Sequence, residues 1–272
     1  MKKEKYDLVF GLGMACSCSQ TLRRAELQHL SFPGDWTAPV WGEPPPEHDL
    51  RARVEMMRDD LEGLLEEREL VFHGPHEWNG KDIYINHRNG YVFNHDFPHG
   101  VPLHDSLPKI QAKYARRQAR LYELIRQSKK VLVVRIDRPD CKHPTPLDDC
   151  RYARETLAKK FPGVRFDFLL MQMDAGRAFA ERTVETLEPG FTRVAFDYWD
   201  KSPGVQSYQP KFEETVAAVS ALCEVRDYRT AAEKRAYWLA RARQRWAKYG
   251  ATTFLGYVWR RCLAVFKSRN GS

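Results

Sequence analysis

A strand, a glycine loop and a helix start follow one another in Tyr6-Asp7-Leu8-Val9-Phe10-Gly11-Leu12-Gly13-Met14-Ala15-Cys16-Ser17-Cys18-Ser19-Gln20. The apolar run before the glycines is typical of a buried strand, and the residues after the cysteines have helical spacing. Ser17 and Gln20 form a capping-box pattern, which predicts that the helix starts near Ser17. Such a strand–loop–helix unit is the usual opening of an α/β domain.

The predicted helix start places Cys16 beside unpaired backbone amides and the positive end of the helix dipole. Both features favour a thiolate over a thiol, so Cys16 is a candidate nucleophile. Backbone amides between Met14 and Ser17 would then form an oxyanion hole. The alternative is that Cys16 is a small buried residue without chemistry.

Strands and helices alternate along the second half of the chain. The β-branched run Val131-Leu132-Val133-Val134-Arg135-Ile136 is typical of a central parallel strand. Helices are expected at residues 147–161 and 212–223, and strands at 164–173 and 192–199. We therefore expect an α/β fold with a mostly parallel central sheet flanked by helices.

Residues 49–128 carry additional elements. Apolar spacing predicts a helix over residues 49–69, and Asn89-Gly90 predicts the turn of a β-hairpin insertion over residues 82–97. A basic helix is expected over residues 109–128.

The charge of the chain is concentrated at its C-terminal end. The net charge is +8, and residues 229–272 contain eleven Lys or Arg and one Glu. We expect an α/β domain over residues 1–228 and a basic amphipathic helical tail over 229–272. No recognisable nucleic-acid module is present, so no nucleic-acid partner is expected. The lack of an export signal and of a long apolar run predicts a cytoplasmic protein whose six cysteines are reduced.

A polar trio between aromatic residues, Phe93-Asn94-His95-Asp96-Phe97, supplies a candidate base. Histidine has the pKa that suits proton transfer near neutrality. A carboxylate or amide would orient its ring, and Asn94, Asp96 and the strand-end Asp137 are the candidates.

Three segments together resemble an uncharacterised bacterial family of papain-like cysteine peptidases. They are residues 11–17, the block Ser31-Phe32-Pro33-Gly34-Asp35-Trp36 and residues 93–97. The family has Leu-Gly-x-x-Cys after its first strand, then Ser-x-Pro-Phe-Asp-Trp and later His-Asp-Phe; Gly34 replaces the Phe here. The resemblance covers roughly residues 6–200. It implies Cys16 as nucleophile, His95 as base, and Asp35 and Trp36 as further pocket residues.

The function implied is acyl transfer on a small-molecule, peptide or glycan substrate, as a hydrolase or an acyltransferase. An alternative is a transferase or binding protein of bacterial surface-polysaccharide assembly, whose Gly11–Gly13 loop cradles the phosphates of a nucleotide sugar or coenzyme A. A non-catalytic scaffold is a third class. No cofactor and no metal are expected, because the cysteines lack the paired C-x₂-C spacing of structural zinc sites.

The tail has an apolar helical face formed by Trp238, Leu239, Ala242, Trp246 and Tyr249, with basic residues around it. A second amphipathic piece is expected over residues 254–266. These helices would pack on the body with their long basic side chains extended to water. Alternatively, they would dock on an anionic inner-membrane surface and make the protein peripheral there.

Overall fold

The computed structural model describes residues 3–38, 48–77, 79–205, 209–240, 242–243 and 246. The chain divides into two compact units, residues 1–226 and 227–272, and each is described by itself. No helix among the described residues is long and apolar enough to cross a membrane.

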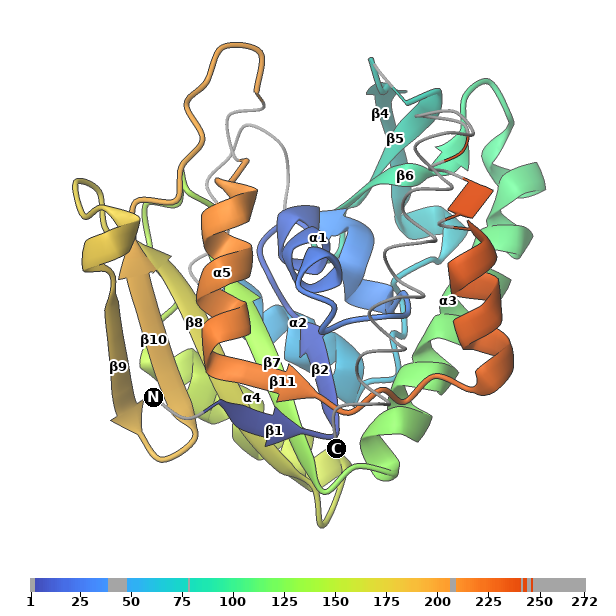
Figure 1. Ribbon diagram of the computed structural model, residues 1–272. Coiled ribbons are helices and arrows are strands. Elements are labelled where there is room, and N and C mark those ends of the chain that lie inside the picture. Colours follow the sequence, from blue (N-terminus) through green and yellow to red (C-terminus); the bar gives the residue numbers. More distant parts are fainter. Residues whose placement is uncertain are drawn as a thin grey trace. The chain divides into compact units, whose positions relative to one another are not determined.

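The first unit is built on a five-stranded sheet with the order β2-β7-β8-β10-β9 (Figure 1). Its strands are β2 (Leu8–Gly11), β7 (Lys130–Ile136), β8 (Arg165–Met173), β10 (Phe191–Phe196) and β9 (Thr183–Glu188). The first four are parallel, and β9 is antiparallel to β10. This confirms the predicted α/β fold with a mostly parallel sheet. A separate parallel pair joins β1 (Glu4–Tyr6) to β11 (Cys223–Val225).

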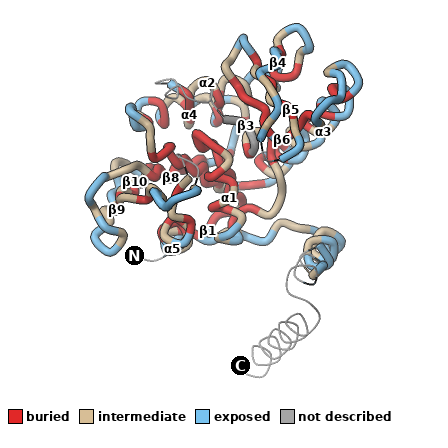
Figure 2. The backbone as a smooth tube through the Cα atoms, turned by 90° about the horizontal axis from the view of Figure 1, so that it is seen from above, coloured by how far each residue is buried: buried red, intermediate tan, exposed pale blue. Residues whose placement is uncertain are grey.

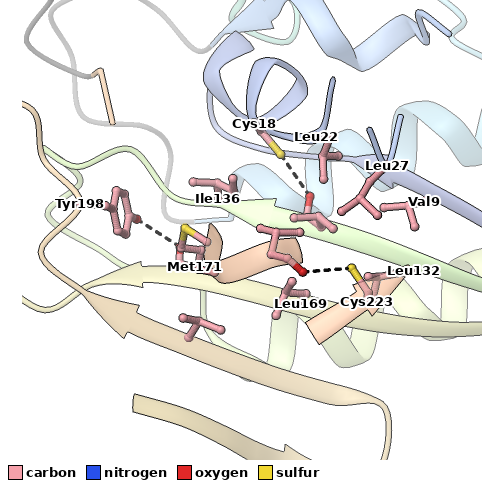
Figure 3. Packing of buried hydrophobic residues seen from close by; sticks show 14 of the residues in the cluster. Val9, Cys18, Leu22, Leu27, Leu132, Ile136, Leu169, Met171, Tyr198 and Cys223 are labelled. Carbon is pink, nitrogen blue, oxygen red and sulfur yellow. Dashed lines mark hydrogen bonds between the residues drawn. The ribbon is translucent and has the colours of Figure 1, made fainter. Parts of the chain in front are cut away.

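Helices cover both faces of this sheet because its strands are apolar on both sides. On one face lie α1 (Cys16–Arg24) and α5 (Phe212–Leu222), and on the other lie α2 (Asp49–Arg58) and α4 (Leu147–Lys160) (Figure 1). Cys18 and Leu22 of α1 pack on the sheet in the core under the first pair (Figure 3). Buried residues gather along α1 and β8 (Figure 2).

The predicted hairpin is part of a four-stranded antiparallel sheet with the order β3-β6-β5-β4. Its strands are β3 (Thr37–Ala38), β6 (Tyr91–Pro98), β5 (Lys81–Asn86) and β4 (Leu70–Pro75). The aromatic face of this sheet packs on α3 (Leu103–Arg126), which leads back to β7. This second sheet lies on the β2 side of the parallel sheet (Figures 1 and 2).

Several predicted elements end elsewhere in the structure. The helix expected over residues 49–69 stops at Arg58, where Asp60, Leu61 and Gly63 take positive φ angles that a helix does not allow. The basic helix begins at Leu103 rather than at 109, and the strand expected over 192–199 ends at Phe196. The antiparallel strand β9 was not predicted. Short 3₁₀ turns η1 (Pro33–Trp36), η2 (Glu67–Glu69) and η3 (Phe179–Glu181) complete the unit.

The described part of the second unit contains helical residues 231–240. Trp238, Leu239 and Trp246 are exposed. Tyr249 and the amphipathic piece expected over residues 254–266 lie outside the described residues.

Candidate functional site

The loop between β2 and α1 extends the parallel sheet before it turns into the helix. The amides of Leu12 and Met14 donate to carbonyls of β7 at 2.9 and 3.1 Å. The Met14 amide is therefore already hydrogen-bonded within the sheet and is not free to act as the predicted oxyanion donor. Helix α1 begins at Cys16 with Ala15 as its N-cap, and no side chain caps it. The predicted capping box is wrong, because Ser17 lies buried inside the first turn.

Both glycines of the loop are needed for close packing of the helix on the sheet. A Cβ atom at Gly13 would lie 2.2 Å from Cys18 Cβ, and one at Gly11 would lie 2.9 Å from Cys18 Sγ. The Cys18 side chain thus occupies the space beside both glycines. This packing explains why both positions are glycines, and no phosphate ligand is needed to explain them.

The Cys16 thiol is half-buried at the start of α1, at the carboxyl end of β2. Gln20, one helical turn later, donates from Nε2 to the sulfur at 3.6 Å. Burial raises the pKa of the thiol, while the Gln20 amide and the backbone N–H groups of Cys16 and Ser17 lower it by a smaller amount. The expected shift toward thiolate is therefore wrong for this structure, because desolvation outweighs the helix N-terminus.

Asp35 is buried between α1 and η1, and its carboxylate accepts hydrogen bonds from four donor groups. Its carboxylate receives Ser19 Oγ at 2.9 Å, Gln28 Nε2 at 2.7 Å, the Phe32 amide at 2.8 Å and Arg23 Nη2 at 3.1 Å. Gln28 also reaches the second carboxylate oxygen at 2.8 Å. Burial raises the pKa of this carboxyl. Asp35 thus fixes η1 to the helix that carries the thiol.

The backbone of Trp36 closes η1, and its side chain lies outside what the structure describes. Its predicted role in a pocket stays a prediction.

His95 lies inside β6, where the pairing with β5 is irregular. The residue is exposed, and its ring centroid is 6.2 Å from that of His76. Although the residue as a whole is exposed, neighbouring groups partly desolvate the ring, and this lowers the pKa of His95. The Asp96 charge raises the pKa, and His76 lowers it. The net direction is downward, so the imidazole is neutral at neutral pH.

Asn79 determines which nitrogen of His95 carries the proton. Asn79 Oδ1 accepts from the Lys81 amide at 3.0 Å, so its Nδ2 must face Nδ1 of His95, 3.3 Å away. An amide N–H that faces Nδ1 makes this nitrogen the acceptor. The hydrogen-bond network therefore assigns the ring proton to Nε2.

Asp96 and Asn94 flank His95 and are buried. Asp96 forms a salt bridge with Lys113 and accepts from the Tyr114 hydroxyl at 2.8 Å, so its oxygens are bonded to α3. The Asn94 side-chain oxygen has no hydrogen-bond partner within the described residues. Asp96 acts on the His95 ring through its charge.

Asp137 is buried at the end of β7 and organises the loop that follows. It accepts from Arg135 Nε at 3.1 Å, from the amide and hydroxyl of Thr145 at 2.8 and 2.5 Å, and from Gln172 at 3.3 Å. Arg135 in turn donates to the Leu12 carbonyl at 2.8 Å. Asp137 therefore supports the loop before Cys16, and the bonds of its carboxylate are to residues other than His95.

Tyr114 of α3 is influenced by two of the buried carboxylates described above. Ser19, one turn after Cys16, bonds to Asp35, and the charges of both Asp35 and Asp96 raise the pKa of Tyr114. Of these two carboxylates, Asp96 is the one that accepts a hydrogen bond from Tyr114. Among the described residues, the hydrogen-bond partner of the Cys16 sulfur is Gln20 and not His95, so a direct pairing of Cys16 with His95 stays a prediction.

Sequence reasoning missed several residues of this region: His76, Asn79 and Arg135, and the bond that Gln20 makes to Cys16. Two of them leave a signal in the sequence. Gln20 lies four residues after Cys16, which is the spacing of facing side chains on a helix. Arg135 interrupts an otherwise apolar strand, and a charge in a buried strand requires a partner.

Comparison with protein-family models, with curated proteins and with solved structures finds no match for the chain. The described residues contain no group of three or more His, Cys, Asp or Glu side chains that could hold a metal ion.

Proposed function

We propose that this protein is a cysteine-dependent hydrolase or acyltransferase in which Cys16 is the nucleophile and His95 its base. One observation carries the proposal: a half-exposed thiol stands at the first residue of α1, at the carboxyl end of β2. The carboxyl edge of a parallel sheet is the usual place for a ligand. The amides of Cys16 and Ser17 lie close enough to stabilise the sulfur and the oxyanion that forms beside it.

The chemistry follows from the two shifted pKa values. The thiol has a raised pKa and the imidazole a lowered one, so both are uncharged before the reaction. When His95 takes the thiol proton, the thiolate adds to the substrate carbonyl carbon. The bond to the leaving alkoxide or amine then breaks, and the proton passes to that group. Water or another acceptor finally cleaves the thioester and releases the acyl group.

The proposal requires a rearrangement when substrate binds. Cys16 must exchange its bond to Gln20 for one to His95, and the accepting nitrogen of His95 must become available. Asp96 is assigned the role of stabilising the imidazolium, because its charge raises the pKa of His95. Asp137 is assigned a supporting role for the loop.

The test is acylation of the full-length protein by p-nitrophenyl acetate. Mass spectrometry of the intact protein detects the acyl group, and absorbance measures the release of nitrophenol. Cys16→Ser is expected to abolish the acyl-protein, and His95→Gln to slow its formation at least about a hundredfold. Cys141→Ser is the matched control, because Cys141 is also half-exposed and its pKa is also raised by burial. Equal acylation of the Cys16→Ser protein would refute the proposal.

A second proposal concerns the tail, which we infer binds anionic membrane surfaces. In its described part, the side chains of Trp238, Leu239 and Trp246 are exposed. The sequence of residues 229–272 is also strongly basic. Aromatic side chains insert at the lipid interface, and each nearby cation adds about 1 kcal/mol of attraction to anionic lipid.

Vesicle co-sedimentation of the full-length protein tests this second proposal. We expect binding to vesicles with phosphatidylglycerol and little binding to pure phosphatidylcholine. Trp238→Ala with Trp246→Ala should weaken binding about tenfold or more. Val71→Ala with Phe72→Ala, which removes exposed apolar side chains of β4, is the control and should bind normally. Binding that is insensitive to the tryptophan changes would contradict the idea.

A further inference from the structure

A cavity of about 150 Å³ lies on one face of the parallel sheet, near the amino ends of β7 and β8. In the register of the strands, Leu132 of β7 lies beside Asp167 of β8. Two residues further along β8, Leu169 lies beside Thr192 of β10, and Thr192 lies opposite Thr186 of β9. Because alternate residues of a strand share a face, these side chains form one continuous floor of the cavity.

The roof of the cavity comes from the end of α5 and from the parallel pair of β1 and β11. Leu222 and Cys223 line the cavity from α5 and β11, and Glu4 and Tyr6 line it from β1. Cys223 packs in the same core cluster as Leu132 of the floor (Figure 3). The cavity is therefore built from elements of the first unit alone.

The volume of the cavity limits the size of a bound molecule. In an engineered protein, an apolar cavity of about 150 Å³ holds benzene. A molecule of comparable size, with about six non-hydrogen atoms, therefore fits here. Leu132, Leu169 and Leu222 offer contacts to an aliphatic chain. The hydroxyls of Thr186 and Thr192 offer hydrogen bonds to a polar group.

Arg165 supplies the strongest hydrogen-bond donors of the cavity wall. Its side chain is 61% exposed, while its Nε donates to the buried carboxylate of Asp167 at 2.9 Å. Nε is the only atom of this guanidinium with a hydrogen bond among the described residues. The two Nη groups therefore keep their N–H donors for a ligand, and their planar fork matches a carboxylate.

Three cations and two carboxylates lie around the cavity. Lys130 pairs with Glu4 and lies 3.3 Å from Asp167. Arg165 is the second cation. Lys3 is the third: burial raises the pKa of the thiol in the roof, and the Lys3 charge lowers it, which places this cation nearby. These groups together leave one positive charge in excess, which a bound monoanion would balance.

We propose that this cavity binds a small aliphatic monocarboxylate, about the size of butyrate. The carboxylate accepts from the Nη groups of Arg165, and the chain lies on the leucines of the floor and roof. The site is independent of acyl transfer, because Cys16 stands at the carboxyl end of β2 and the cavity lies near the amino ends of the neighbouring parallel strands.

Leucine-methyl NMR on the full-length protein tests the proposal, with sodium butyrate as the probe. We expect butyrate to shift the methyl signals of Leu132, Leu169 and Leu222 in a saturable way. Butyramide, which has the same size and no charge, should bind at least about tenfold more weakly, because it forms no ion pair with Arg165. Arg165→Gln should weaken butyrate binding by at least about tenfold as well, the effect of losing a hydrogen bond to a charged group. Thr186→Phe should abolish the shifts, since this position is exposed on the edge strand β9 and an aromatic ring there fills the cavity.

Arg193→Gln is the matched control. Arg193 follows Thr192 on β10 and therefore points to the opposite face of the sheet, so its loss should leave butyrate binding unchanged. The absence of a saturable shift would overturn the proposal, and so would equal affinity for butyramide or equal affinity of the Arg165→Gln protein. Shifts that persist in the Thr186→Phe protein would place butyrate elsewhere and overturn the site. If Arg165→Gln does not fold, the comparison of butyrate with butyramide on the unchanged protein still decides.

Discussion

The first turn of α1 and the strand around His95 hold their candidate catalytic groups in opposite ways. Cys16 follows a loop that is fixed by packing, with Cys18 pressed against Gly13 and backbone bonds to β7. His95 is exposed on an irregular strand, where Asn79 contacts its Nδ1 and the ring of His76 lies beside its own. Both surroundings nevertheless favour the uncharged form, since the pKa of the thiol is raised and that of the imidazole lowered. The difference teaches that the position of the thiol is set by close packing and that of the imidazole by fewer contacts, so the rearrangement that the proposed mechanism requires is expected at the histidine strand.

The largest expected effect tests the packing of the first region. Gly13→Ala places a methyl group where Cys18 already lies, and the contact involves Cβ atoms close to the backbone. We expect the free energy of unfolding to fall by about 3 kcal/mol, the upper range for overpacking. Urea denaturation measures it. Gly34→Ala, whose new methyl meets no atom closer than 3.7 Å, is the control and should change little. A Gly13→Ala protein of normal stability would show that the helix is not packed as described.

A smaller effect tests the polar attachment of the second region. Asp96→Asn removes the charge that pairs with Lys113 and accepts from Tyr114. We expect a loss of about 2 kcal/mol in the free energy of unfolding, typical of a buried hydrogen bond to a charged group. The pKa of His95 should also fall further, because the Asp96 charge raises it. Asp105→Asn on the exposed side of α3 should alter neither quantity. If the pKa of His95 is unchanged in the Asp96→Asn protein, the Asp96 charge does not act on the His95 ring.

The smallest effect concerns the tautomer of His95. Asn79→Ala removes the donor to Nδ1 and should raise the pKa of His95 slightly, since a bond to the neutral form is lost. ¹⁵N NMR of the ring in the unchanged protein should show the proton on Nε2 and a midpoint below about 6.5. Because the pKa is lower in the folded state, His95 should reduce stability as the pH falls below that value. A midpoint above 6.5 would mean that protonation of His95 stabilises the folded state instead.

The parallel sheet could be predicted because its signals are local. The run of β-branched residues at 131–136 and the helix over 147–161 need no knowledge of distant partners, and both occur as predicted to within a residue. Strand β9 was missed because an edge strand is half-exposed and has a mixed pattern, with Thr183 to Glu188 carrying two glutamates. The helix expected up to residue 69 was cut short by positive φ angles at non-glycine residues, which spacing does not reveal.

The candidate site was harder to predict because it depends on burial. The sequence places Cys16 at a helix start, and the structure does as well. The direction of its pKa could not be derived, because desolvation depends on what η1 and the sheet bring around the thiol. The bonds of Asp96 to Tyr114 and of Asp137 to Gln172 depend equally on packing between residues distant in the sequence.

The parallel pair of β1 and β11 has a consequence for biosynthesis. Glu4 to Tyr6 leave the ribosome well before their partners Cys223 to Val225, which are made about 220 residues later. At elongation rates of about 5–20 residues per second, the opening strand waits some tens of seconds or less for its partner. The pairing of β1 with β11 is therefore a late event, and nascent chains stalled before that point would keep the edge of β1 unpaired and open to chaperones.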